Sequence, residues 1–271
     1  MIKVNGITIQ QNHFPAGELL IKADFPGCEL MSIEWYYEND AELFTLICVK
    51  RHIDEKYPGC FCELRMPYLA HARMDRVKNE EDVFTLKYFC EVINSLHFTT
   101  VWVRDAHSNV SLALLNNVKE EPVKLFIGDA IGQSDADVLF FPDEGAMKRY
   151  SGSFQMPYAF GMKKRDWETG QILGLDIINA DVVKDKNVLI VDDICSYGGT
   201  FYHSAKALKE AGAKSVSLYV THCEKSITLG SLASSDGLVD HVYTTKSILP
   251  ERLFGDNFDP YWKKWITVLE D

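Results

Sequence analysis

The stretch NVLIVDDICSYGGTFYHSAKALKEAGA, from Asn187 to Ala213, combines three features within one short segment. The apolar run Val188–Val191 predicts a buried strand, and two acids, Asp192 and Asp193, follow it directly. A loop of small residues then leads into a helix that we expect from Thr200 to Ala211. A strand, a polar turn and a helix in this order begin the unit from which parallel α/β sheets are built.

The same stretch predicts the chemistry of a ligand. Open α/β sheets bind ligands at the carboxyl ends of their strands, where Asp192 and Asp193 are expected. The loop Ser196–Thr200 opens a helix, so its backbone N–H groups and the helix dipole predict a phosphate site. Adjacent carboxylates can accept hydrogen bonds from the vicinal hydroxyls of a ribose, or bind hydrated Mg²⁺. The alternative is an acidic helix start and a turn that bind nothing. No GxxxxGK occurs, so the loop is not of the Walker type.

The rest of the chain alternates in the same way, which predicts parallel sheets flanked by helices. Further helices are expected at Leu43–Ile53 and Phe84–Leu96, and further strands at Glu63–Met66, Thr99–Val103, Val123–Ile127, Val138–Phe141 and Ser215–Val220. We expect an N-terminal domain over 1–119 and a C-terminal domain over 120–257, with the polar segment Asn116–Pro122 at their boundary. In the remaining piece, 258–271, Tyr261–Leu269 is expected to form a short amphipathic helix that packs on one half.

Composition excludes several classes of protein. Hydrophobic residues make up 46% and charged residues 25% of the 271 residues, as in ordinary globular proteins. A net charge of −11 argues against broad electrostatic binding to nucleic acid or to an anionic membrane. Neither a signal-peptide core nor an apolar run of about 18 residues is evident. Seven cysteines without a CxxC pair indicate reduced thiols, and we expect a cytoplasmic protein.

With these residues in place, the segment Val191–Thr200 resembles the ribose-phosphate binding motif of the type I phosphoribosyltransferase fold. Two families share that motif: transferases that consume phosphoribosyl pyrophosphate, and ribose-phosphate pyrophosphokinases that make it. The segment MPYLAHARMDR, Met66–Arg76, resembles the PY-x-x-ARQDR signature of the pyrophosphokinases, with Met74 in place of the glutamine. This resemblance implies that Arg73, Asp75 and Arg76 bind ATP. It favours a pyrophosphokinase that makes phosphoribosyl pyrophosphate over a transferase that consumes it.

Further upstream, HFPAGELLIKA, His13–Ala23, resembles the F-S-D-G-E loop of the same family. Phe14 and Glu18 match the phenylalanine and the glutamate of that loop. The resemblance implies that both residues belong to the ATP site. It also implies that Phe14 reaches adenine in a neighbouring subunit of a homo-oligomer, either a dimer or a hexamer.

Three further segments continue the resemblance: VWVRDAHSN from Val101, FFPDEGAMKR from Phe140 and FGMKKRDWETGQ from Phe160. In the first two, His107 and Asp143 match residues that help to hold Mg²⁺ near the ATP phosphates. The third resembles the family's flexible catalytic loop. Its Lys163 and Arg165 are the implied catalytic cations, which fits a transfer in which negative charge spreads over the oxygens of the β-phosphorus.

The phosphate loop departs from the family pattern. Where the family has D-T-x-G-T, this chain has Ser196, Tyr197, Gly198, Gly199 and Thr200. The glycines and the threonine keep the anion-binding backbone, but an acid is replaced and an aromatic residue is introduced. Tyr197 either packs within the loop or stacks on a nucleoside beyond a diphosphate, as in ADP-ribose. Some compact, phage-type members of the family are thought to use ADP-ribose as the acceptor.

Together these resemblances imply two phosphoribosyltransferase-like α/β domains with active sites between them and at subunit contacts. The expected reaction transfers the β,γ-diphosphate of Mg·ATP to the C1 hydroxyl of ribose 5-phosphate or ADP-ribose and releases AMP. Two alternatives stay open. One is a non-catalytic ribose-phosphate or nucleotide-binding relative, and the other is a phosphoribosyltransferase that consumes phosphoribosyl pyrophosphate.

Overall fold

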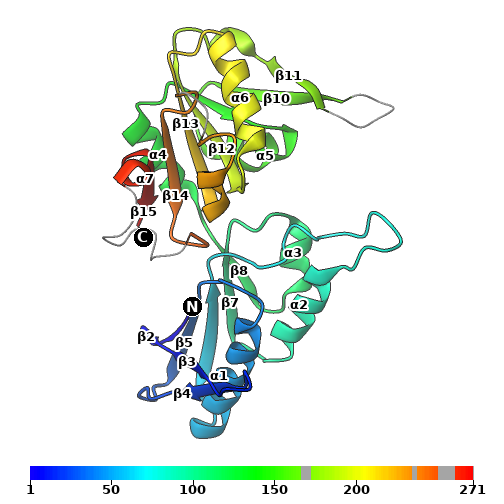
Figure 1. Cartoon of the computed structure of the whole chain (residues 1–271), viewed down its shortest axis with the longest axis vertical. Helices are drawn as coiled ribbons and strands as arrows, with labels where there is room; N and C mark the ends of the chain where they lie inside the picture. Colours follow the sequence, from blue (N-terminus) through cyan, green and yellow to red (C-terminus); the bar gives the residue numbers. More distant parts are fainter. Residues whose placement is uncertain (166–171, 234–236, 250–259, 271) are drawn as a thin grey trace. The chain divides into compact units, whose positions relative to one another are not determined.

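Two sheets, one in each half of the chain, form the framework of the computed structural model (Figure 1). They belong to two separate units, Met1–Pro122 and Val123–Asp271. The structure describes residues 1–165, 172–233, 237–249 and 260–270. In both sheets most neighbouring strands are parallel and are linked through helices, so the predicted α/β class is confirmed.

The first unit contains a six-stranded sheet in the order β2-β1-β5-β6-β7-β8. Strands β5 to β8 are parallel to one another, and β1 and β2 add an antiparallel edge. The elements of this unit, in chain order, are β1 (Ile2–Val4), β2 (Ile7–Thr8), β3 (Gln10–His13), β4 (Leu19–Lys22), β5 (Leu30–Trp35), α1 (Glu42–Lys56), β6 (Phe61–Met66), α2 (Thr85–Asn94), β7 (Thr100–Arg104), α3 (Asn109–Leu114) and β8 (Val118–Glu121).

Strands β3 and β4 form a separate antiparallel hairpin in this unit. The side chains of β5, β6 and β7 alternate between buried and more exposed positions along each strand. Strand β8 lies within Asn116–Pro122, which we had expected to be only a boundary segment. Its polar residues are tolerated because β8 lies beside β7 at the edge of the sheet that the described residues form, where Lys119 and Glu120 remain exposed.

The second unit contains a seven-stranded sheet in the order β11-β10-β9-β12-β13-β14-β15. All neighbouring strands are parallel except β10 and β11, which form an antiparallel pair at one edge. The elements of this unit are α4 (Lys124–Ser134), β9 (Val138–Phe141), α5 (Glu144–Tyr150), η1 (Ser151–Ser153), β10 (Tyr158–Arg165), β11 (Ile172–Ile178), η2 (Ala180–Val182), β12 (Asn187–Cys195), α6 (Gly199–Glu210), β13 (Ser215–Cys223), η3 (Lys225–Leu229), β14 (His241–Thr245), α7 (Pro260–Trp265) and β15 (Ile266–Leu269).

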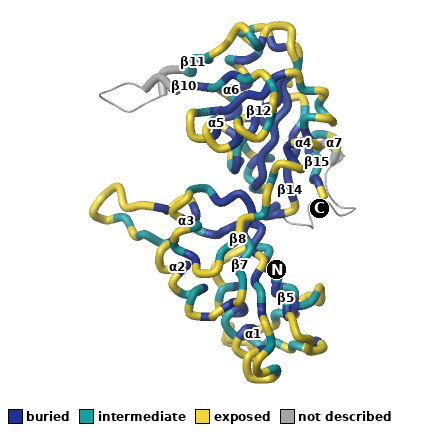
Figure 2. The backbone as a smooth tube through the Cα atoms, turned by 180° about the vertical axis from the view of Figure 1, so that it is seen from behind, coloured by how far each residue is buried: buried dark blue, intermediate teal, exposed yellow. Residues whose placement is uncertain are grey.

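Helices cover both faces of this second sheet. On one face, Phe201, Ala205 and Leu208 of α6 pack against the strands. On the other, α4 and α5 contribute a second apolar cluster that includes Phe126 and Tyr150. Figure 2 shows β12 as a buried strand, and Val188–Val191 are at most 1% exposed. Because β12 is covered on both faces, its run is continuously apolar rather than alternating.

The predicted strand Val123–Ile127 is wrong, because α4 occupies Lys124–Ser134. Its buried residues, Phe126, Ile127 and Ala130, recur at helical spacing, whereas Leu125 is 77% exposed. A strand within a covered sheet would not leave such a leucine in solvent. A short apolar run fits both a strand and a helix. Here the buried Ala130, which lies beyond the run, continues the helical spacing and favours the helix.

The helix expected over Tyr261–Leu269 is correct only in its first part. Helix α7 ends at Trp265, and Ile266–Leu269 form β15, which pairs in parallel with β14. The residues Ile266, Thr267 and Val268 are β-branched and favour a strand. Ile266 and Leu269 are buried, so this strand completes the edge of the second sheet.

Candidate active site

The two acids of the quoted stretch lie within β12, which continues to Cys195 instead of ending at Val191 as predicted. Asp193 is 6% exposed and lies 3.5 Å from Arg149 of α5, measured between Oδ2 and Nη1. Asp192 accepts a hydrogen bond from the backbone N–H of Asp193 through Oδ1, at 3.0 Å. Both carboxylates are therefore held at the carboxyl end of the central strand.

Negative charge is concentrated around Asp192. Burial raises the pKa of its carboxyl well above the ordinary value, and the neighbouring charges of Asp193 and Asp143 raise it further. Asp143 follows β9, the strand beside β12, and caps α5 by accepting a hydrogen bond from the N–H of Ala146 at 3.1 Å. Three carboxylates at the carboxyl ends of two neighbouring strands repel one another, so this edge attracts a cation or hydrogen-bond donors.

The predicted phosphate loop lies between β12 and α6. Gly198 adopts the left-handed conformation, with φ of 79°, and directly precedes the first helical residue, Gly199. The N–H groups of the first helical turn have no partner inside the helix, and the helix dipole adds positive potential there. Gly199 has open space where a Cβ would lie, so a ligand can approach the backbone closely. The backbone at the start of α6 is therefore open to a ligand, and phosphate binding by this loop stays a prediction.

Tyr197 points out of this loop and is 60% exposed. Of the two roles left open for Tyr197, this exposure argues against packing within the loop. Its backbone, by contrast, is tightly enclosed. A Cβ on Gly230 would lie 1.8 Å from the carbonyl oxygen of Tyr197, and a Cβ on Gly198 would lie 2.7 Å from Leu232.

The segment that encloses the loop follows β13 and includes η3. Glu224 donates its backbone N–H to the carbonyl of Cys195 at 2.8 Å. The hydroxyl of Ser226 lies 3.1 Å from that of Ser196 and donates to Glu224 Oε2 at 3.2 Å. The loop is thus supported by residues that follow it by about thirty positions in the sequence, because β12 and β13 are paired.

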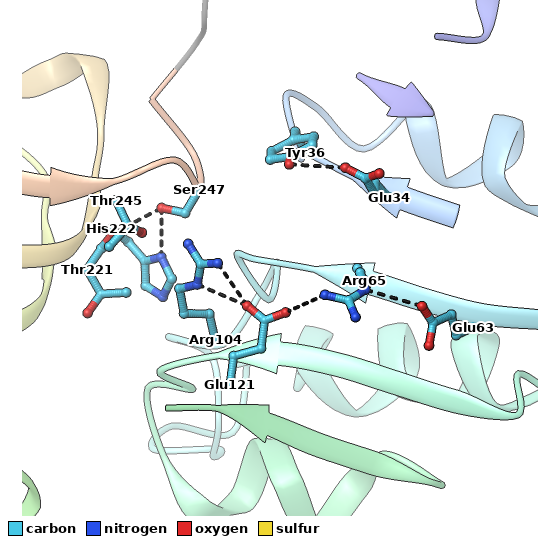
Figure 3. Close-up of polar contacts among 10 residues, drawn as sticks. All are labelled: Glu34, Tyr36, Glu63, Arg65, Arg104, Glu121, Thr221, His222, Thr245 and Ser247. Carbon is cyan, nitrogen blue, oxygen red and sulfur yellow. Dashed lines mark hydrogen bonds and ion pairs between the residues drawn. The ribbon is translucent and has the colours of Figure 1, made fainter. Parts of the chain in front are cut away.

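Buried polar residues fix the point where β13 ends (Figure 3). His222 is 4% exposed and its Nδ1 lies 3.0 Å from the hydroxyl of Ser247. Ser247 and Thr245 both donate to the carbonyl of Thr221, at 3.1 and 2.9 Å. These bonds tie β13 to β14 and to the residues after β14, and so place the segment that supports the phosphate loop.

In the first unit, the structure brings together three of the predicted ATP and metal residues. Arg76 donates to Asp75 through two nitrogens, Nε to Oδ1 at 2.7 Å and Nη2 to Oδ2 at 2.9 Å. Hydrogen bonding from Arg76 holds the pKa of the Asp75 carboxyl below its usual range, and the charge of His107 contributes in the same direction. Arg76 and Arg73, three residues earlier, are both exposed.

His107 follows β7, whose last residue, Arg104, belongs to a second network of charges. Arg104 and Arg65 both contact Glu121, at 2.9 and 3.3 Å, and Arg65 also reaches Glu63 at 3.2 Å (Figure 3). Between Arg104 and His107, the buried Asp105 adopts the left-handed conformation, with φ of 44°. Such a conformation is uncommon in a residue other than glycine and is typical of functional turns.

Phe14 and Glu18 lie at the turn of the β3–β4 hairpin. The N–H of Phe14 donates to the carbonyl of Glu18 at 2.8 Å, and Gly17, with φ of 90°, donates to the carbonyl of Phe14 at 2.8 Å. The Phe14 side chain is 51% exposed. It does not belong to the apolar core, and its ring is accessible to a ligand or to another chain.

Lys163 and Arg165 lie on β10, which continues beyond the end of its neighbour β9. Lys163 pairs with Leu175 of β11, and the register shifts between Lys164 and Arg165. The segment Phe160–Gln171 was expected to be a flexible loop; its first six residues form a strand, and 166–171 lie outside the described residues.

Magnesium fits the donor types of the second unit, where Asp143, Asp192 and Asp193 offer carboxylate oxygens. Within the described ranges, no three side chains of His, Cys, Asp or Glu gather into a ready-made metal site. Mg²⁺ commonly uses one or two carboxylates together with substrate phosphates, so these carboxylates suit the expected ion. In the same described ranges, no helix combines the length and apolar character needed to cross a membrane.

Sequence reasoning did not assign Arg149, Glu224, Ser226 or Gly230 to the site. Arg149 lies in the quoted segment Phe140–Arg149 and could have been considered as a partner for an acid. The other three carry no local signal, since a Glu, a Ser and a Gly after a strand are common in any loop. They become site residues only through the pairing of β12 with β13.

Comparison with known proteins agrees with this geometry. A family model described as a phosphoribosyl transferase domain matches residues 153–244, which include the acids, the phosphate loop and α6. The chain is 27% identical over 264 residues to the ribose-phosphate pyrophosphokinase of Thermococcus kodakarensis, and the match covers 91% of each protein. It is also 27% identical over 230 residues to the same enzyme of Pyrococcus abyssi, covering 80% of this chain and 77% of that one.

The fold is likewise shared with a solved structure. The crystal structure of phosphoribosylpyrophosphate synthetase from Mycobacterium smegmatis matches 97% of this chain and 86% of its own, with a TM-score of 0.75 and 19% identity. The α/β fold of this chain is therefore one that is already known, at low sequence identity.

Proposed function

We propose the function of this chain from one premise: it is a homologue of the ribose-phosphate pyrophosphokinases. The chain is accordingly a diphosphokinase, and it transfers the β,γ-diphosphate of ATP to the C1 hydroxyl of ribose 5-phosphate. The C1 oxygen forms a bond to the β-phosphorus, the bond from that phosphorus to the oxygen of the α-phosphate breaks, and AMP leaves. The C1 hydroxyl proton is released.

The observation that carries this proposal is the arrangement at the end of β12. Two carboxylates, Asp192 and Asp193, lie next to the open first turn of α6. A ribose phosphate has the complementary groups, since its hydroxyls donate hydrogen bonds and its phosphate accepts them. In our proposal Asp192 and Asp193 orient the sugar hydroxyls, and backbone N–H groups of the loop Ser196–Thr200 bind the 5′-phosphate end.

The donor site belongs to the remaining motifs. We assign ATP binding to Arg73, Asp75 and Arg76, together with Phe14 and Glu18 of the hairpin. The exposed ring of Phe14 supports a role in stacking on adenine, which would extend from one subunit to its neighbour in a homo-oligomer.

Lys163 and Arg165 are assigned to the transferred diphosphate. Cations at this point neutralise charge that grows on the β-phosphoryl oxygens in the transition state. His107 and Asp143 would hold Mg²⁺, which when bound supplies further neutralisation of the phosphate oxygens. Most of the rate enhancement then comes from positioning and charge neutralisation, without a covalent intermediate on the protein.

A second acceptor, ADP-ribose, is favoured by one feature of this chain. Tyr197 projects from the phosphate loop with 60% of its surface exposed. An aromatic ring at this place is suited to stack on a nucleoside attached through a second phosphate, and a single 5′-phosphate has no use for it. The same sugar chemistry would then give the 1-diphosphate of ADP-ribose.

Incubation of the chain with Mg²⁺, ATP and either acceptor tests both proposals. We expect AMP and the 1-diphosphate of the sugar, identified by anion-exchange chromatography and phosphorus NMR. AMP with ribose 5-phosphate supports the general reaction, and AMP only with ADP-ribose supports the second acceptor. AMP with neither acceptor, or release of pyrophosphate from phosphoribosyl pyrophosphate and a base, would contradict the proposed reaction.

A further inference from the structure

Three side chains form a chain of hydrogen bonds at the start of the phosphate loop. The hydroxyl of Ser196 lies 3.1 Å from that of Ser226, which in turn donates to Glu224 Oε2 at 3.2 Å. Glu224 and Ser226 come from the segment after β13, and Ser196 comes from the end of β12. A backbone bond from Glu224 to Cys195 keeps the two segments in contact at the same place.

The direction of these bonds follows from proton counting. An ionised carboxylate can only accept a hydrogen bond, so Ser226 must give its single hydroxyl proton to Glu224. Ser226 can then only accept from Ser196, and the proton of Ser196 is used in that bond. The Ser196 oxygen then offers its lone pairs as acceptors and has no proton to donate. In this arrangement Ser196 is an acceptor toward any ligand in the loop.

We propose that Ser196 accepts a hydrogen bond from a hydroxyl of the acceptor sugar, and that Ser226 and Glu224 are positioning residues that enforce this. A phosphate at neutral pH offers mainly acceptor oxygens, so Ser196 cannot serve the phosphate while its proton is bound to Ser226. The phosphate is left to the backbone N–H groups that open α6. Like the nearby carboxylates Asp192 and Asp193, Ser196 then selects for sugar hydroxyls. This inference rests on the proposed function and refines the same site.

The variant Ser226→Ala tests the relay, because it removes the acceptor for the Ser196 proton while leaving Ser196 in place. We expect its KM for the acceptor sugar to rise about tenfold, the usual size of one hydrogen bond, with kcat and the KM for ATP within about twofold of wild type. Thr228→Val is the matched control, since Thr228 lies in the same short helix and its hydroxyl donates to the nearby carbonyl of Lys225 at 3.0 Å.

The double variant Ser226→Ala/Ser196→Asp separates positioning from a structural role. An aspartate accepts hydrogen bonds without any relay, so the double variant should recover most of the lost sugar affinity. A second readout is selectivity. The value of kcat/KM for ribose 5-phosphate is divided by the value for its 2-deoxy or its 3-deoxy analogue. In Ser226→Ala this ratio should fall for the analogue that lacks the hydroxyl bound by Ser196.

Three results would overturn the inference: equal sugar KM values in Ser226→Ala and Thr228→Val, no recovery in the double variant, or unchanged ratios for both analogues. Thermal melts of each variant show whether a loss of activity is a loss of folding. A wild-type chain that releases no AMP contradicts the proposed function instead. In that case the same variants are compared by calorimetric titration with ribose 5-phosphate. Ser226→Ala should bind the sugar more weakly than wild type and Thr228→Val, and the double variant should recover most of the affinity.

Discussion

Gly230 lies directly against the carbonyl oxygen of Tyr197, so closely that a Cβ at residue 230 would be 1.8 Å from that oxygen. The same Cβ would also meet the carbonyl carbon and Cα of Tyr197, at 2.5 and 2.8 Å. All three neighbours are backbone atoms, which cannot turn away as the end of a side chain can. The position of the phosphate loop therefore depends on the absence of a side chain at residue 230.

Gly230→Ala is expected to displace the loop. We predict a decrease in the free energy of unfolding of about 1–3 kcal/mol, the usual range for overpacking, and a rise in the KM for the acceptor sugar. Urea denaturation and steady-state kinetics measure the two effects. Gly132→Ala in α4 is the control, because a Cβ there meets nothing within 4 Å and alanine favours a helix. An unchanged sugar KM in Gly230→Ala would show that the loop tolerates the shift.

Lys163→Ala is expected to lower kcat more than it weakens ATP binding. If the ammonium acts on charge that develops in the transition state, kcat should fall by about 10²–10³-fold while the Kd for ATP changes less than about threefold. Rapid-quench kinetics and equilibrium binding of ATP give the two numbers. Equal losses in both quantities would identify Lys163 as a residue that binds ATP in the ground state.

Tyr197→Ala distinguishes the two acceptors. The side chain is 60% exposed, so its removal should change the free energy of unfolding by less than about 0.5 kcal/mol. The KM for ribose 5-phosphate should stay the same, whereas the KM for ADP-ribose should rise about fivefold through loss of stacking. Tyr197→Phe should behave like wild type with both acceptors. If Tyr197→Ala leaves both KM values unchanged, Tyr197 no longer supports ADP-ribose as an acceptor.

The pair of Asp75 and Arg76 predicts a dependence of stability on pH. Because the folded state holds the pKa of Asp75 below its usual range, the unfolded state binds more protons between the two pKa values. The contribution of this carboxylate is present above the unfolded pKa, near 3.9, and is lost as the pH falls toward the lower folded value. In urea denaturation between pH 7 and pH 3, Asp75→Asn should show a smaller loss of stability than wild type. Asp129→Asn, which removes a carboxylate at an exposed position of α4, is the matched control.

Cysteine labelling should follow burial. Burial raises the pKa of the thiols of Cys62, Cys90 and Cys223 to about 12, so almost none of each is thiolate at pH 8. Cys28 is exposed. Under native conditions iodoacetamide should label Cys28 first, and the three buried thiols should react only after unfolding, as peptide mass spectrometry would show. Early labelling of Cys223 would mean that the end of β13 opens readily.

The sequence by itself determined the features that depend on neighbouring residues. The apolar run before Asp192, the small residues of the loop and the helix that follows are local signals, and the structure confirms the strand and α6. The alternation along the chain was enough for the α/β class. The local pattern predicted a strand instead of a helix where an apolar run was short, at Val123–Ile127. It predicted a helix instead of a strand where a β-branched tail joins the edge of a sheet, at Ile266–Leu269.

Only the tertiary structure decided which distant residues surround the loop. The contact of Arg149 with Asp193, the enclosure of Tyr197 by Gly230 and the relay from Ser196 to Glu224 all join residues about thirty to forty-five positions apart. Such pairs carry no sequence pattern of their own, because they are created by the register of β12 with β9 and β13. Strand pairing aligns the carboxyl ends of separate strands, and a residue gains a role at the site from that alignment rather than from its neighbours in the chain.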